Sequence, residues 1–192
     1  MDQVRLFVAF DTPAAVKASA MEVIQKLRTA NADVGWDRDD KMHCTVKFLG
    51  ETRHDQLDHI VDVLQRLSEE FPPFAIAYRS LGFFPNAREP RVLWIGIEDL
   101  HAGLAPLQQS VEQQLVPLGF AAETRRFHPH LTLGRIRSGR NQRQLLATAE
   151  SITFATEPYV IGSLSLMRSD LRPTGSVYKQ EKNFPLIGKS HC

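Results

Sequence analysis

The chain has 192 residues, of which 43% are hydrophobic and 23% charged, and its formal net charge is +1. These values suit a globular domain with a sizeable core and exclude the strongly basic character of proteins that wrap duplex nucleic acid. A local positive patch would still suffice for a nucleotide or an RNA end. Two cysteines, Cys44 and Cys192, are too few for a disulfide framework, and no basic leader or apolar run of roughly 18 residues is visible. We therefore expect a cytoplasmic protein that makes no membrane contact. We also expect a monomer, although the sequence itself does not give the oligomeric state.

Apolar periodicity in the first half predicts strands that alternate with helices. Pro13 suits the first position of a helix, Pro72 and Pro73 suit the end of another, and Gly50 is expected to end a strand. The expected elements are a strand over residues 4–10, a helix over 14–28, a strand over 42–49, a helix over 55–71 and a strand over 74–84.

The second half repeats this order of elements. Residues 85–90 begin and end with proline and indicate a loop between the halves. The expected elements that follow are a strand over residues 91–97, a helix over 100–116, a strand over 130–136, a helix over 141–150, strand segments over 152–154 and 160–168, and a last edge strand over 176–184.

The two halves are in register as well as alike. An offset of 87 residues separates His43 from His130 and Thr45 from Thr132, and the same offset relates two apolar strand segments that begin at Leu6 and Leu93. We therefore predict a single α+β domain over 1–192 with two pseudo-symmetric lobes, formed by residues 1–87 and 88–186, and a tail over 187–192. Each lobe is expected to hold a mainly antiparallel sheet with helices on its outer face, and the active cleft is expected between the lobes.

The repeated His-x-Thr pattern carries the candidate chemistry. Side chains alternate along a strand, so His43 and Thr45 share one face, as do His130 and Thr132, while Cys44 faces the core side. Two imidazoles on opposite sides of a phosphorus atom could act as general acid and general base near neutral pH, and threonine hydroxyls could donate hydrogen bonds to phosphate oxygens. This scheme needs no metal and no cofactor.

These motifs resemble a known family. The segments HCTVKFLG from His43 and HPHLTLGRI from His128 are similar to the paired signatures of the two-histidine (2H) phosphoesterase superfamily. The segments RLFVAFD, GFFPNAREPRVLWIGI and LMRSDLRPTGSVYKQEKNFPL extend the resemblance almost end to end, to the RNA 2',3'-cyclic phosphodiesterase family, also named 2'-5' RNA ligases.

The resemblance implies hydrolysis of RNA or nucleotide 2',3'-cyclic phosphates to 2'-phosphomonoesters, with RNA ends or nucleotides as binding partners. His43 would be the proton donor to the leaving 3' oxygen and His130 the proton acceptor from the attacking water. Two alternatives remain at this stage. A 2'-5' RNA ligase would use a 5'-hydroxyl in place of water, and a non-catalytic binder would hold RNA ends or nucleotides without turnover.

Three further residues are candidates for substrate binding. The resemblance places Phe48 and Arg135 at the nucleotide site, where Phe48 could stack on a base and Arg135 could stack or pair with phosphate. Both lie five residues after their histidines, on the wrong face of an ideal strand, so they reach the cleft only if the strand bulges, twists or ends first. Otherwise Phe48 belongs to the core and Arg135 to the surface. Lys47 has the parity to add positive charge beside His43, or it is simply solvated.

Residues just before the second motif have no assigned role. Arg125 and Arg126 could meet RNA phosphates or be solvated. His128 and His130 form a His-x-His pair that could bind zinc, but the sequence offers no third ligand nearby, and we expect no metal site.

Overall fold

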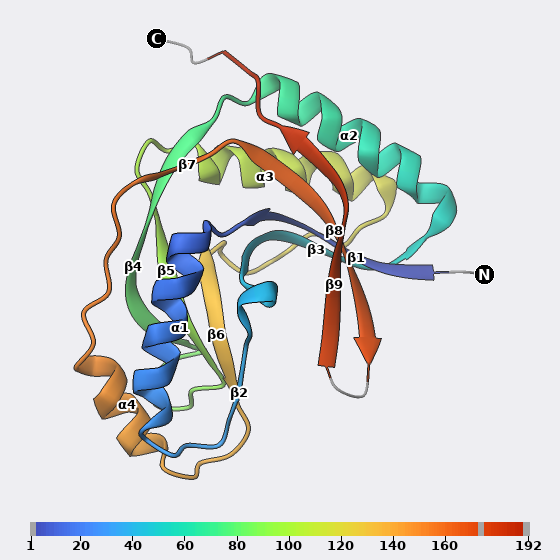
Figure 1. Ribbon diagram of the computed structural model, residues 1–192. Helices are drawn as coiled ribbons and strands as arrows, with labels where there is room; N and C mark the ends of the chain where they lie inside the picture. Colours follow the sequence, from blue (N-terminus) through green and yellow to red (C-terminus); the bar gives the residue numbers. More distant parts are fainter. Residues whose placement is uncertain (1–2, 173–174, 190–192) are drawn as a thin grey trace.

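The structure is a computed structural model that describes residues 3–172 and 175–189, and it contains two antiparallel sheets (Figure 1). The four-stranded sheet has the order β3-β1-β8-β9, made of β1 (Gln3–Asp11), β3 (His43–Arg53), β8 (Ser163–Arg172) and β9 (Gly175–Pro185). The five-stranded sheet has the order β2-β6-β5-β4-β7, made of β2 (Val34–Trp36), β6 (His130–Ile136), β5 (Val92–Asp99), β4 (Phe74–Phe84) and β7 (Tyr159–Ile161).

Two pairs of helices cover the two sheets. The helices α2 (Leu57–Glu70) and α3 (Leu104–Leu115) lie together against the four-stranded sheet, whereas α1 (Ala14–Arg28) and α4 (Gln142–Glu150) lie beside the five-stranded sheet (Figure 1). Each helix buries one apolar stripe, and the stripes join the strands in one connected core. The predicted α+β class with two antiparallel sheets is thereby confirmed. Across the described ranges, no helix is both long and apolar enough to cross a membrane.

The lobes are not the two halves of the chain. The strands β1 and β3 of the first half pair with β8 of the second, and β5 and β6 of the second half share a sheet with β2 and β4 of the first. The prediction that residues 1–87 form one lobe and residues 88–186 the other is therefore wrong. Local periodicity specifies each element, but the partner strand that an element finds is a long-range choice that the pattern does not encode.

Most element boundaries agree with expectation, and the differences have local causes. The Asp99 carboxylate accepts hydrogen bonds from the backbone N–H groups of Gly103 and Leu104 at 3.0 and 2.8 Å, so α3 begins at Leu104 and not at residue 100. Gly50 does not end its strand: it has φ of 73° and β3 continues to Arg53. Residues 152–154 form no strand.

A β-bulge interrupts each histidine strand at the same position. In the β1–β3 pair, Ala9 lies opposite Thr45 and Val8 opposite Lys47, which leaves Val46 without a partner. In the β5–β6 pair, Trp94 lies opposite Thr132 and Leu93 opposite Gly134, which leaves Leu133 without a partner. Each extra residue stands three positions after its histidine and reverses the face of the residues that follow.

Candidate active site

The two His-x-Thr motifs meet in one pocket between the sheets. The pocket has a volume of about 370 Å³, and His43, Thr45, His130 and Thr132 all line it. Its other walls come from β1, β4, β5, the segment before β3, and the β8–β9 hairpin. The remaining lining residues are Arg5, Leu6, Phe7, Asp37, Lys41, Phe48, Phe84, Val92, Arg135, Ser169, Leu171, Ser176 and Tyr178.

Both imidazole rings interact with the backbone two residues upstream. The Nδ1 atom of His130 lies 2.7 Å from the carbonyl oxygen of His128, and because a carbonyl oxygen only accepts, Nδ1 donates. The ring of His43 likewise hydrogen-bonds to the backbone of Lys41, which is also two residues upstream. In the neutral His130 ring the free lone pair is therefore on Nε2, the nitrogen available for proton transfer.

Aromatic rings pack against both histidines, which are half-buried. The ring of His43 lies 4.8 Å from that of Phe7 and 5.1 Å from that of Tyr178, and the ring of His130 lies 4.8 Å from that of Phe84. Burial disfavours the imidazolium form, so it lowers the pKa of His43 to about 4 and also lowers the pKa of His130. Both rings are therefore mainly neutral at pH 7 in the free protein.

The bulges bring Phe48 and Arg135 into the pocket despite their sequence parity. Phe48 follows the extra residue Val46, and Arg135 follows Leu133, so each turns to the face of its histidine and lines the pocket. Phe48 is 69% exposed, which excludes the alternative that it belongs to the core. An exposed aromatic side chain and an exposed guanidinium at the rim of one pocket are suited to stack on a nucleobase.

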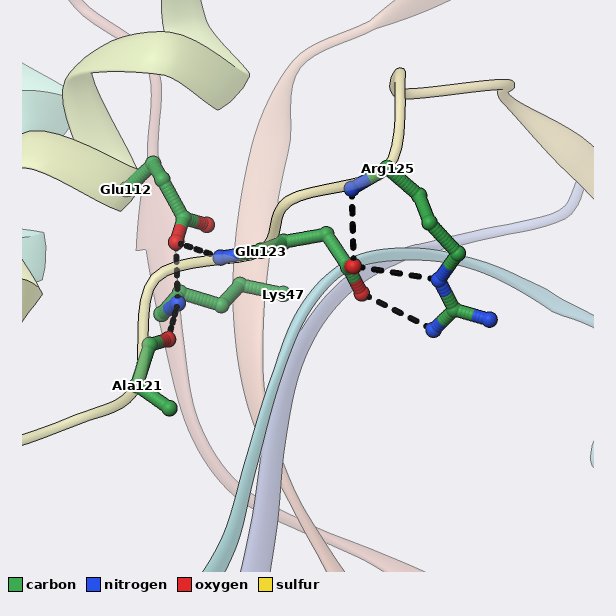
Figure 2. A network of polar contacts seen from close by, with 5 residues as sticks. All are labelled: Lys47, Glu112, Ala121, Glu123 and Arg125. Atoms are coloured by element: carbon green, nitrogen blue, oxygen red, sulfur yellow. Dashed lines mark hydrogen bonds and ion pairs between the residues drawn. The ribbon is translucent and has the colours of Figure 1, made fainter.

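The same bulge turns Lys47 away from the pocket, so the prediction that Lys47 faces the cleft is wrong. Its side chain is 2% exposed, and its Nζ donates to the Glu112 carboxylate of α3 at 2.6 Å and to the Ala121 carbonyl at 2.8 Å. The same carboxylate oxygen of Glu112 accepts from the backbone N–H of Glu123 at 2.8 Å (Figure 2). Lys47 thus ties β3 to the segment that leads from α3 to His130.

The remaining candidates from the sequence lie either at the surface, beside the pocket or in the core. Arg125 pairs with Glu123 at the surface (Figure 2), and Arg126 is exposed. His128 packs its ring against Trp94 at 4.7 Å and supplies the carbonyl that orients His130. Cys44 is fully buried on the core side as expected, and burial raises the pKa of its thiol to about 12.

Several residues that line the pocket were not predicted from the sequence. Phe7 and Tyr178 enclose His43, and Asp37 and Lys41 lie in the segment that leads into β3. Phe7 was part of the repeated strand segment, which offered a signal, because it precedes His43 as Trp94 precedes His130. Asp37 and Lys41 gave no signal, because irregular segments carry no periodicity. Within residues 3–172 and 175–189, no group of three or more His, Cys, Asp or Glu side chains could hold a metal ion.

Comparison with known proteins assigns the class. A family model described as LigT-like phosphoesterase matches the chain twice, over residues 10–94 and 95–178, so the chain belongs to this family of enzymes. The double match confirms the internal repeat. Relatives within this family are named RNA 2',3'-cyclic phosphodiesterase. The chain is 31% identical to the relative from Methanothermobacter thermautotrophicus, over 96% of this chain and 100% of the relative. It is 32% identical to the relative from Thermotoga maritima, over 91% of each chain.

Solved structures agree on the fold. TT0787 of Thermus thermophilus superposes with a TM-score of 0.82 at 26% identity, covering 97% of this chain and 100% of that one. Escherichia coli LigT, solved in complex with 3'-AMP, superposes with a TM-score of 0.76 at 24% identity, covering 97% and 99%. At this identity, the second likeness shows the fold alone.

The buried Lys47–Glu112 pair predicts a large stability effect. Lys47→Met leaves the Glu112 carboxylate without its cation inside the protein, so we expect the free energy of unfolding to fall by about 3 kcal/mol or more in urea titrations. The double variant Lys47→Met/Glu112→Leu should recover part of this loss, because neither charge then remains buried. Arg125→Ala, which breaks only the exposed pair of the same network, is the control and should change little. A Lys47→Met protein as stable as wild type would contradict the buried pair.

Burial of His43 predicts a pH dependence of stability. The pKa of His43 is lowered to about 4 in the folded protein, so the unfolded chain takes up the proton first, and the stability contributed by the neutral ring above pH 6.5 is lost as the pH falls toward 4. The loss is at most about 1.4 kcal/mol per pH unit. Urea titrations between pH 7 and pH 4.5 should show a shallower decline for His43→Gln than for wild type. His59→Gln, which removes an exposed imidazole of α2, should decline as wild type does.

Proposed function

We propose that this enzyme hydrolyses 2',3'-cyclic phosphates at RNA ends or on nucleotides to 2'-phosphomonoesters, with His43 and His130 as general acid and general base. One observation carries the proposal: two His-x-Thr motifs on twin strands of two sheets line one pocket, and both rings are held by the backbone two residues upstream. The names of the full-length relatives support the substrate class.

In the proposed reaction, the Nε2 atom of His130 removes a proton from a water molecule as its oxygen attacks phosphorus. The bond between phosphorus and the 3' oxygen breaks, and the proton carried by His43 passes to that oxygen. The product keeps the phosphate on the 2' oxygen, and the two histidines have exchanged their protonation states. Thr45 and Thr132 are placed to donate hydrogen bonds to the non-bridging oxygens, whose charge redistributes during attack.

The lowered pKa values suit proton transfer by both rings. Burial lowers the pKa of His43 to about 4 and also lowers the pKa of His130. A protonated His43 is therefore a strong acid, which suits the leaving oxygen, because that oxygen becomes strongly basic as its bond to phosphorus breaks. A bound phosphate anion favours the imidazolium form and raises the pKa of a histidine beside it, which increases the fraction of His43 that can donate.

The nucleoside would occupy the end of the pocket where Phe48 and Arg135 lie. Phe48 from β3 and Arg135 from β6 come from opposite sheets, so a base between them could stack on the ring of one and on the guanidinium of the other. Escherichia coli LigT, which has the same fold, was solved with 3'-AMP bound, which is consistent with a nucleotide in such a pocket. Arg5 and Lys41 add positive charge for the phosphate or for the rest of an RNA strand.

Removal of either histidine tests the assigned roles. We expect His43→Ala and His130→Ala each to lower kcat on 2',3'-cyclic nucleotides by about 10²- to 10⁴-fold, with an unchanged circular dichroism spectrum. Cys44→Ala is the matched control, because Cys44 lies between two pocket residues but faces the core, and its rate should stay near wild type. Excess chelator should leave the rate unchanged, and chromatography should identify the 2'-phosphate as the product. A near-normal rate in either histidine variant would refute the mechanism.

The lowered pKa values predict an acid-shifted rate profile. The reactive form of the free enzyme carries a proton on His43 and none on His130, and both pKa values lie below 6.5, so kcat/KM should be highest below pH 6.5 and should fall toward higher pH. Because the bound phosphate raises both pKa values, the maximum of kcat should lie at a higher pH than that of kcat/KM. A kcat/KM that rises to a plateau above pH 7.5 would contradict this arrangement.

A further inference from the structure

The pocket contains one carboxylate that the mechanism does not use. Among the described residues that line it, Asp37 alone is acidic, beside the cations Arg5, Lys41 and Arg135. A carboxylate repels a phosphate anion, so Asp37 is unsuited to the part of the pocket that holds the phosphate. It is an acceptor without a proton to give, and the groups it can bind are hydrogen-bond donors.

Strand pairing places Asp37 on the same face as Arg135. Gly35 of β2 lies opposite Arg135 of β6, and the backbone N–H of Asp37 donates to the Leu133 carbonyl at 2.9 Å, which continues the ladder one residue past the strand. Asp37 stands two residues after Gly35 and therefore shares its face, as the diagonal neighbour of Arg135. Such neighbours lie within reach of one ligand.

Among the described residues, none donates a hydrogen bond to the carboxylate of Asp37. Across residues 3–172 and 175–189 it accepts no hydrogen bond and forms no ion pair, although Arg135 and Lys41 are near enough to act on it electrostatically. Burial is the larger effect and raises the pKa of the Asp37 carboxyl above its ordinary value. A half-buried acceptor that lacks a partner gains most from a ligand that supplies donors.

Resting on the function proposed above, we propose that Asp37 selects the base of the nucleotide that carries the cyclic phosphate, and that it favours guanine. A base that stacks on Arg135 presents its edge to the diagonal neighbour of Arg135, which is Asp37. Guanine offers two parallel donors on that edge, N1–H and the N2 amino group, and these match the two oxygens of a carboxylate. Adenine and cytosine offer one amino group beside an unprotonated ring nitrogen. Uracil offers one N–H between two carbonyl oxygens that repel the carboxylate.

The test compares the four 2',3'-cyclic nucleotides on wild type, Asp37→Asn and Asp40→Asn. Wild type should turn over the guanosine compound with the highest kcat/KM and the uridine compound with the lowest. Asp37→Asn replaces one acceptor by a donor, so its kcat/KM for guanosine should fall about tenfold or more, mainly through KM, while that for uridine holds or rises. Asp40→Asn removes the same charge from an exposed neighbour that pairs with Arg38, and it should keep the wild-type base order.

The possible results separate the role of Asp37 from the proposed hydrolase function. Loss of guanine preference in Asp37→Asn alone supports the inference. An unchanged base order in Asp37→Asn, an equal change for all four bases, or a wild-type preference for uridine overturns it. Calorimetric titration of 2'-GMP and 2'-UMP into the same three proteins tests base selection without turnover, so a wild-type enzyme that hydrolyses no cyclic nucleotide would defeat the proposed function while the role of Asp37 is still decided.

Discussion

The site depends on one extra residue in each of two strands. Val46 and Leu133 are the bulged residues, and each lies three positions after a histidine. Before the bulge, alternation places histidine and threonine on the pocket face. After it, the reversed face brings Phe48 and Arg135 to the same pocket. A regular strand would turn Phe48 and Arg135 away from the pocket, so a backbone irregularity organises both halves of the site.

The reversal also explains how a lysine comes to lie in the core. Lys47 stands beside the bulge and is turned toward α3, where Glu112 and the Ala121 carbonyl receive its ammonium group. The segment held there crosses from the helix of one lobe to the histidine strand of the other. The ion pair therefore fixes the start of the chain segment whose His128 carbonyl orients His130. The stability of this segment and the orientation of the His130 ring are therefore connected through one buried charge.

The sequence predicted what is local and repeated, and it failed where long-range pairing decides. The offset of His43 and Thr45 from His130 and Thr132 predicted a shared pocket, because alternation within a strand is a local rule. The exchange of strands between lobes was missed, because equal halves predict equal elements and say nothing of their partners. Strict alternation placed Thr45 correctly but placed Lys47 on the wrong face, because a bulge lies between them. A bulge can be recognised only once the pairing with the neighbouring strand is known. Asp37 lies beyond the end of a three-residue strand, where no pattern exists to interpret.

A symmetric motif cannot by itself distinguish an acid from a base, so the asymmetry must come from the surroundings. The ring of His43 packs against Phe7 and against Tyr178 of the β8–β9 hairpin, whereas the ring of His130 packs against Phe84 of β4. Burial lowers the pKa of His43 to about 4 and also lowers the pKa of His130. Twin strands thus present the same two groups to one pocket, and the different walls around each ring are where we propose that their roles diverge.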